Sequence, residues 1–170
     1  MLNEAVGVKL KNFGPIILLY YFSISELDTH FENYFEILSF NLQLIIVYFW
    51  VLKRPAILGN GHIFLAGLIN DVVMGFPLGL SSLSYLVVSF FATYIKNMSV
   101  HTTLTSDWFT FIIALLISNF TFLTLISKFS ELTFSITEML YNTFFTFILF
   151  PFFWFLFTFY NSTVRFRENA

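Results

Sequence analysis

The sequence predicts an all-α membrane protein with six transmembrane helices and with both termini in the cytoplasm. Three observations predict this fold class: an apolar composition, six apolar stretches of spanning length, and an uneven distribution of Lys and Arg. Hydrophobic residues make up 58% of the 170 positions, charged residues make up 11%, and the mean hydropathy is +0.81. A soluble domain averages about 25% charged residues. This chain therefore has too few charged side chains to cover the surface of a water-soluble globule.

The apolar stretches are counted on the basis that a spanning helix needs about 20 mostly apolar residues. On this basis we expect a single transmembrane domain over residues 1–170, without a separate soluble domain. The expected spans are approximately 10–27, 37–52, 56–76, 78–96, 107–127 and 136–160.

Orientation follows from the excess of basic residues that cytoplasmic loops carry. If the N-terminus is cytoplasmic, six spans leave only Lys128 on the opposite side of the membrane. The cytoplasmic side then holds Lys9, Lys11, Lys53, Arg54, Lys96, Arg165 and Arg167. An odd number of spans would destroy this asymmetry.

The first two expected spans are short, and we expect the first to be retained as a membrane helix because no cleavage site follows it. The second ends at Lys53 and Arg54, interpreted as topology anchors, followed by Pro55, which stops the helix. The last span contains Pro151 and is long enough to tilt or kink.

The third and fourth spans form the most informative segment, because an aspartate lies there inside an apolar run. Gly67, Asp71 and Gly75 are spaced at i, i+4 and i+8 and share one helix face, along which a second backbone could approach closely. Pro77 cannot continue the helix, so we expect the third span to end near Gly75. We expect Pro77 itself to open the next helix at its first turn, completing a tight external hairpin.

Three interpretations of Asp71 remain open, since a carboxylate in a span needs a partner or a function. It could hydrogen-bond the neighbouring helix and cap the hairpin, contact a protein partner, or relay protons or ions. Asn119 in the fifth span is the expected buried polar companion of Asp71.

Other function classes find little support. The chain has no cysteine, which excludes disulfides and thiol chemistry, and its net charge of −2 and lack of basic clusters do not favour a nucleic-acid partner. Ser81 and Ser82 superficially suggest an intramembrane nucleophile, but no matching histidine or lipase-type motif accompanies them. We therefore expect neither an enzyme, nor a metal site, nor a cofactor.

The segment from Pro55 to Tyr85 resembles the sequence pattern of the MreD family of rod shape-determining membrane proteins. In this family a proline closes the second span, and F-x-x-G-L-x-x-D and G-x-x-L-G motifs follow in the third and fourth. The matching residues are Pro55, Phe64, Gly67, Leu68, Asp71, Gly75, Leu78, Gly79, Leu83 and Tyr85. The chain length, the small loops and six spans agree with the family as well.

The resemblance implies a non-enzymatic component of the bacterial elongasome in the inner membrane, acting in rod-shape determination and lateral peptidoglycan synthesis. The implied partner is MreC, a bitopic coiled-coil protein, and through it MreB, a SEDS glycosyltransferase and a class B penicillin-binding protein. The implied fold is a six-helix bundle similar to the S-components of ECF vitamin transporters. Pro55, Phe64, Gly67, Asp71, Gly75, Pro77 and Gly79 would then shape a packing or partner surface.

An S-component-like solute-binding subunit of an ECF-type transporter is the alternative. It predicts a polar and aromatic pocket near the external loops, to which Asn119 and the acidic segment 26–36 could contribute. Fold alone does not decide between these functions.

Overall fold

The computed structural model describes residues 13–25, 41–98, 103–129 and 136–168, and the regular secondary structure in these ranges is entirely helical. These ranges contain six helices, in agreement with the all-α prediction. They are α2 (Gly14–Ile24), α3 (Leu42–Lys53), α4 (Asn60–Met74), α5 (Leu80–Met98), α6 (Leu104–Phe129) and α7 (Ile136–Glu168).

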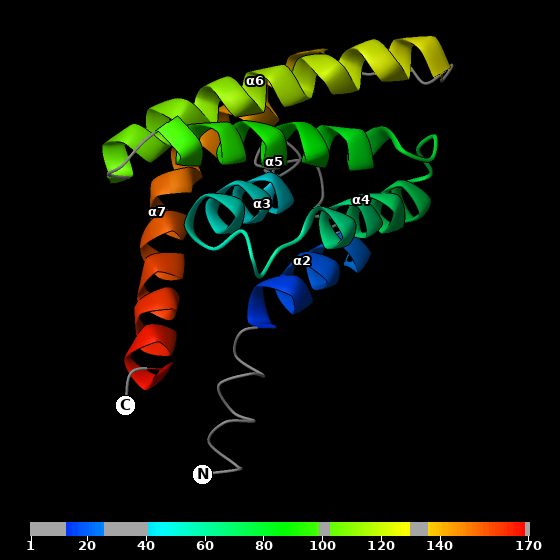
Figure 1. Ribbon diagram of the computed structural model, residues 1–170. Helices are drawn as coiled ribbons and strands as arrows, with labels where there is room; N and C mark the ends of the chain where they lie inside the picture. Colours follow the sequence, from blue (N-terminus) through cyan, green and yellow to red (C-terminus); the bar gives the residue numbers. More distant parts are fainter. Residues whose placement is uncertain (1–12, 26–40, 99–102, 130–135, 169–170) are drawn as a thin grey trace, which may run out of the picture.

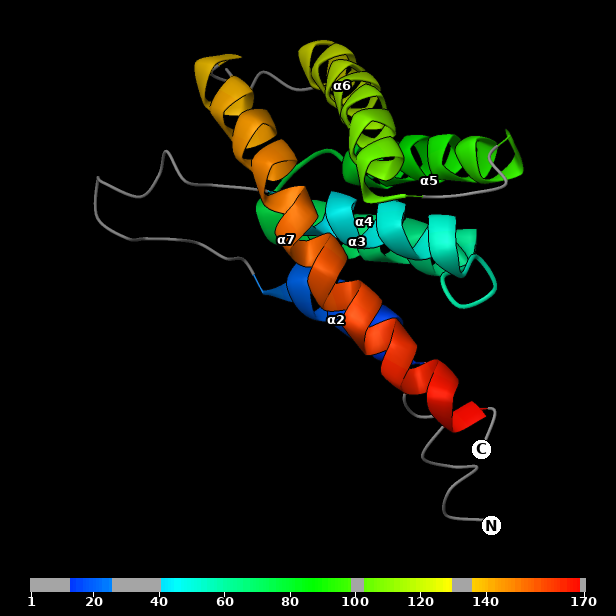
Figure 2. The ribbon, with the colours of Figure 1, turned by 90° about the vertical axis from the view of Figure 1, so that its left-hand side faces the viewer.

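Two central helices organise the bundle. Helix α5 packs against α3, α4 and α6, and Figure 1 shows it between α6 on one side and α3 with α4 on the other. Helix α3 packs against α2, α5 and α7. The long α7 runs across α5 and α6 rather than alongside them, as Figures 1 and 2 show from two directions.

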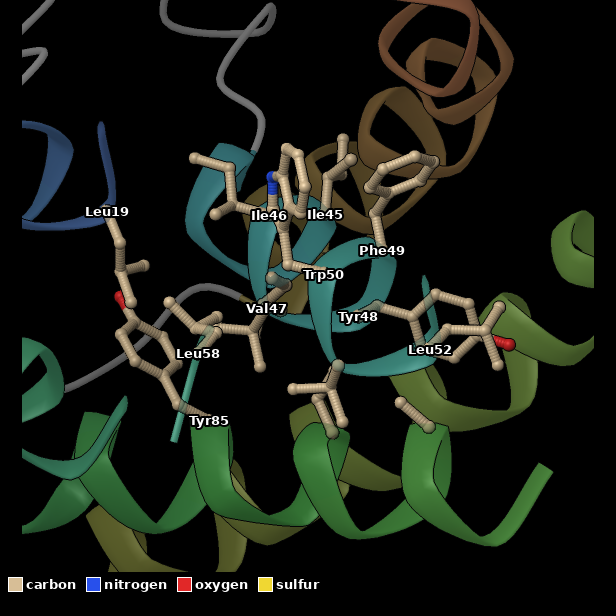
Figure 3. Close-up of a cluster of buried hydrophobic side chains, with 14 of the residues drawn as sticks. Leu19, Ile45, Ile46, Val47, Tyr48, Phe49, Trp50, Leu52, Leu58 and Tyr85 are labelled. Carbon is tan, nitrogen blue, oxygen red and sulfur yellow. The ribbon is translucent and has the colours of Figure 1, made fainter. Parts of the chain in front are cut away.

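Helix α3 forms the core because it is apolar on every side. Ten of its 12 residues, from Leu42 to Leu52 except for Gln43, are buried. A helix that is hydrophobic all round must be surrounded by protein or lipid. Figure 3 shows its side chains radiating toward neighbouring elements, among them Leu19 of α2 and Tyr85 of α5.

Stacked aromatic rings join α3 to the two long helices. The rings of Phe111 in α6 and Phe150 in α7 stack with centroids 4.4 Å apart, and Tyr48 of α3 lies 5.1 Å from Phe111 and 5.9 Å from Phe150. Such pairs contribute about 0.5–1.5 kcal/mol beyond the burial of their area. Part of the high phenylalanine content, 26 of 170 residues, therefore serves internal packing.

Pro151 lies inside α7 without ending it. Proline has no N–H, so the carbonyl of Phe147, four residues earlier, loses its intrahelical donor. The indole Nε1 of Trp108 in α6 donates to this carbonyl at 2.9 Å, and the Trp108 and Phe147 rings stack at 5.0 Å. A side chain from a neighbouring helix thus satisfies the group that the proline frees.

Two of the described helices, Leu104–Phe129 and Ile136–Ser162 within α7, are long and apolar enough to cross a membrane. The other four described helices do not meet the same criterion. Helices α2 and α3 have 11 and 12 residues and rise only about 16 and 18 Å, against a hydrocarbon core of about 30 Å. Helix α4 has 15 residues, and the serines of α5 make it more polar. The described helices therefore support two membrane-spanning helices by length and composition, and do not establish six. Parts of the expected spans 10–27 and 37–52 lie outside the described residues.

Candidate functional site

The α4–α5 hairpin is built around the carboxylate of Asp71, which is fully buried. Its Oδ2 accepts a hydrogen bond from the backbone N–H of Gly79 at 2.8 Å, and its Oδ1 accepts one from Ser81 at 2.7 Å. Both donors are among the unsatisfied N–H groups at the start of α5, where a negative charge is also favoured by the helix dipole. This is the contact that the capping interpretation predicts: the last turn of α4 supplies the N-terminal cap of α5.

Two glycines give the hairpin its backbone conformation. Gly75 ends α4 with φ +68°, and its N–H bonds the carbonyl of Asp71; Gly79 precedes α5 with φ +97°. Side-chain-bearing residues rarely adopt either conformation. The prediction that α4 ends near Gly75 is confirmed.

The prediction that Pro77 opens the next helix is wrong. Pro77 lies in the turn, where its carbonyl accepts from the N–H of Leu80, and α5 begins at Leu80. The positive φ of Gly79 prevents the helix from starting earlier, and the Asp71 carboxylate is placed to cap Gly79 and Ser81 instead.

Gly67 allows α4 and α5 to approach closely. A Cβ added at Gly67 would clash with the backbone Cα and N of Ser82 in α5, and a helix backbone cannot move aside as the end of a flexible side chain can. At the same crossing the Ser82 hydroxyl donates to the carbonyl of Phe64 at 3.0 Å. The spacing of small residues in the sequence predicted this close approach.

The remaining predicted site residues lie away from the hairpin. Pro55 is exposed in the turn that follows α3, and Arg54 is the residue at the C-cap of α3. The prediction that Lys53, Arg54 and Pro55 close this helix is therefore confirmed. The backbone of Arg165 and Arg167 belongs to the last turns of α7.

Lys53 takes part in a buried cluster that the sequence reasoning missed. Its Nζ lies 2.8 Å from Oδ2 of Asp107 at the start of α6, and the side chains are only 17% and 1% exposed. The indole of Trp154 in α7 donates to the same Oδ2 at 2.9 Å, and Lys53 lies 5.5 Å from the centre of the Trp154 ring. Lys53 is therefore not simply a solvent-facing topology anchor. The available signal was that the end of span two and the start of span five carry opposite charges on the same predicted side.

Asn119 is not the companion of Asp71, so this expectation is wrong. Its Nδ2 donates to the hydroxyl of Thr143 in α7 at 2.7 Å. The amide that accompanies the hairpin is Asn70, which donates to the Ser81 hydroxyl at 3.0 Å. Since backbone N–H groups within ten residues satisfy Asp71, no distant side chain is needed.

Asn119 instead lines a polar cavity of about 300 Å³ at one end of the bundle. The cavity lies where α2 and α4 end and where α3, α5 and α7 begin, and the second half of α6 lines it as well. Ten of its 16 described lining residues carry a carboxamide or a hydroxyl group, and apolar and aromatic side chains lie beside them. The lining residues are Ser25, Asn41, Gln43, Leu44, Asn70, Met74, Phe76, Ser81, Ser84, Tyr85, Ser118, Asn119, Phe122, Glu138, Met139 and Asn142.

The side chains of the hairpin and of the cavity engage mainly in hydrogen bonds. The described part of the chain contains no cluster of three or more metal-ligating His, Cys, Asp or Glu side chains. The hydroxyl of Ser82 is engaged by the Phe64 carbonyl, and that of Ser81 accepts from Asn70. The arrangement offers a stable hairpin and a hydrogen-bonding cavity.

Comparisons with protein-family models, with curated proteins and with solved structures gave no match.

Proposed function

We propose that the protein is a non-enzymatic membrane scaffold of the MreD type in the bacterial cytoplasmic membrane. In this proposal it acts in rod-shape determination and lateral peptidoglycan synthesis by contacting MreC. Through MreC it would act with MreB, a SEDS glycosyltransferase and a class B penicillin-binding protein. The observation that carries the proposal is the α4–α5 hairpin, in which Gly67, Asp71, Gly75 and Gly79 of the MreD-like pattern act together.

These four residues of the sequence pattern lie together in one hairpin. Gly67 sets the distance between the helices, Asp71 caps α5, and the two positive-φ glycines form the turn. Because the Asp71 carboxylate is fully buried, a partner would contact the outward side of the hairpin rather than the carboxylate. Val72, Leu78 and Leu83 are exposed on this hairpin and offer such an apolar surface.

The proposal includes six spans with both termini in the cytoplasm. A contact between helix ends supports this alternating arrangement, because the end of α3 meets the start of α6 through Lys53 and Asp107. The middle of α5 meets the start of α4 through Ser89 and Asn60 at 2.9 Å. The ends of α2 and α4 and the starts of α3, α5 and α7 surround the cavity. In the proposed orientation the Lys53–Asp107 pair lies near the cytoplasm and the hairpin and the cavity lie near the outside.

The short helices are compatible with this arrangement because protein surrounds α3 instead of lipid. The apolar faces of α6 and α7 would form the lipid boundary. They carry the exposed side chains Phe109, Ile113, Leu116, Phe120, Leu140, Phe144, Phe152, Phe155 and Phe159. A surface of this kind is unfavourable in water and favourable in hydrocarbon.

A solute-binding subunit of an ECF-type transporter is the second candidate, and the polar cavity is the observation that favours it. Such a subunit would have to associate with a transmembrane coupling protein and a pair of ATPases. The two functions therefore differ in their partners.

Affinity purification from native membranes tests the proposal. The tagged protein would be extracted in mild detergent, and co-eluting proteins would be identified by mass spectrometry. A similarly tagged, unrelated polytopic protein would serve as the background control. We expect enrichment of a bitopic coiled-coil protein together with cell-wall synthases. Enrichment of an ATPase pair with a coupling subunit would establish the second candidate, and absence of both sets would contradict the scaffold.

A further inference from the structure

The polar cavity retains hydrogen-bonding capacity that the protein does not use. Gln43 donates through Nε2 to the carbonyl of Phe22, and Asn119 donates to Thr143, but within the described chain the acceptor oxygens of both amides have no donor. Asn41 accepts from the N–H of Leu44, which leaves its Nδ2 without an acceptor among the described residues. Two acceptors and one donor therefore remain for a bound molecule.

Tyr85 adds a fourth group. Its side chain is 3% exposed and extends from α5 toward α2 in Figure 3. The hydroxyl forms no hydrogen bond within the described part of the chain, although buried polar groups are normally satisfied. Among the described residues, the fully buried side-chain atoms that lack a hydrogen-bond partner belong to Asp107, Thr158 and Asn161. The four unpartnered atoms of Asn41, Gln43, Tyr85 and Asn119 are not among them, so each of the four is partly exposed. The four residues that carry them all line the cavity.

The charges around the cavity define what it can accept. Among the described residues that line it there is no Lys, Arg or His, and the carboxylate belongs to Glu138, whose side chain is exposed. The described lining therefore offers an anion no counter-charge, and burying an unpaired charge is costly. Carboxamides and hydroxyls offer donors and acceptors together, which match a molecule of the same mixed character.

The size of the cavity and its aromatic lining narrow the class of ligand further. The volume of about 300 Å³ lies at the lower end of the range for small-molecule sites, which is about 300–1,000 Å³. Phe76 and Phe122 meet edge to face with centroids 5.5 Å apart and line the cavity beside Tyr85. These rings supply apolar surface against which the carbon skeleton of a ligand can pack.

We propose that this cavity binds a small, uncharged molecule of monosaccharide size that carries several hydroxyl or amide groups. Asn41, Gln43, Tyr85 and Asn119 supply its hydrogen bonds. This inference goes beyond the scaffold role, which requires no ligand.

Thermal unfolding of the detergent-solubilised full chain tests the inference. Trp50, Trp108 and Trp154 provide an intrinsic fluorescence signal, and the absence of cysteine rules out thiol-reactive dyes. The uncharged probes are glucose, myo-inositol and nicotinamide, and the charged counterparts are glucose 6-phosphate and nicotinate. At ten times Kd, a binding probe should raise the Tm by about 3–6 °C.

Matched variants assign the effect to the cavity. Tyr85→Phe removes only the hydroxyl, and Asn119→Leu removes the amide; each should reduce the ligand-induced rise in Tm. Thr121→Val is the control, because Thr121 lies on α6 outside the cavity lining and its hydroxyl bonds the carbonyl of Ile117. The proposal is overturned if no uncharged probe raises the Tm at millimolar concentration, or if the charged counterparts raise it equally. An equal rise in the Tyr85→Phe and Asn119→Leu variants would also overturn it.

Discussion

Asp71 and Asp107 are both almost completely buried, yet their carboxylates find partners in different ways. Both oxygens of Asp71 accept hydrogen bonds, whereas Oδ1 of Asp107 has no partner among the described residues. Asp71 accepts from backbone N–H groups eight and ten residues further along the chain. Asp107 pairs with Lys53 and accepts from Trp154, which lie 54 and 47 residues away. The carboxylate of Asp71 completes a local hairpin. The carboxylate of Asp107 joins α3, α6 and α7 through residues that are far apart in the sequence.

Burial alone therefore does not define the role of a carboxylate in this protein. Backbone donors at a helix start are fixed by the chain itself, so Asp71 needs no cationic partner. Asp107 depends on a side chain whose removal would leave an uncompensated charge in the interior. The two sites should therefore respond differently to substitution.

Lys53→Met should cause the largest loss. The substitution preserves much of the side-chain volume but leaves the Asp107 carboxylate unpaired, which costs about 3–5 kcal/mol in the free energy of unfolding. Thermal unfolding followed by tryptophan fluorescence would measure it as a large fall in Tm. Lys96→Met near the end of α5 is the matched control and should stay within about 0.5 kcal/mol of the wild type.

The double variant Lys53→Met/Asp107→Asn sharpens the comparison. It removes the stranded charge and keeps an acceptor oxygen for the Trp154 indole, so most of the stability lost in Lys53→Met should return. If the double variant were as unstable as Lys53→Met, the pair would not act as an ion pair.

Asp71→Ala should have the next largest effect, about 2–3 kcal/mol, because it leaves the N–H groups of Gly79 and Ser81 without an acceptor. Asp71→Asn keeps one oxygen and should lose about half as much. The same fluorescence measurement compares the two variants. A wild-type Tm for Asp71→Ala, together with reduced recovery of partner proteins, would favour the partner-contact interpretation instead.

Gly67→Ala should cost about 1–3 kcal/mol, because the added methyl group meets the Ser82 backbone and separates α4 from α5. Gly61→Ala on the same helix is the control, since a Cβ there has no neighbour within 4 Å. Equal Tm values for the two variants would count against the close helix contact.

Trp108→Phe should have the smallest effect, about 1 kcal/mol, because one hydrogen bond to the Phe147 carbonyl is lost. In a Pro151→Ala background the helix supplies its own N–H to that carbonyl, so the loss on Trp108→Phe should shrink. A double-mutant cycle of Tm values measures this coupling. Equal losses in both backgrounds would show that the indole does not compensate for the proline.

The parts of the structure that are local in sequence could be predicted well. The end of α4 at Gly75 follows from glycine chemistry, and the close contact at Gly67 follows from the spacing of small residues. The start of α5 was misplaced because proline at a first turn is a general preference, whereas the cap that Asp71 provides depends on the folded hairpin. The helix itself was predicted correctly, and its start was misplaced by three residues, from Leu80 to Pro77.

The long-range contacts could not be predicted in the same way. Nothing in one sequence says that Lys53 meets Asp107, or that Asn119 bonds Thr143 instead of Asp71, because helix rotation decides which side chains face each other. The polar cavity likewise requires the ends of five helices and the second half of α6 to come together. Residue type gave the chemistry of these groups, but only the packing gave their partners.

In the proposed topology the Asp71 hairpin and the Lys53–Asp107 pair lie at opposite faces of a membrane, and single-cysteine labelling tests this most directly. The chain has no cysteine, so Leu78→Cys in the hairpin turn and Ala56→Cys after α3 each introduce one exposed thiol. With a membrane-impermeant maleimide on intact cells we predict labelling of Leu78→Cys, and labelling of Ala56→Cys only after permeabilisation. Labelling of both variants from the same side would contradict the proposed topology.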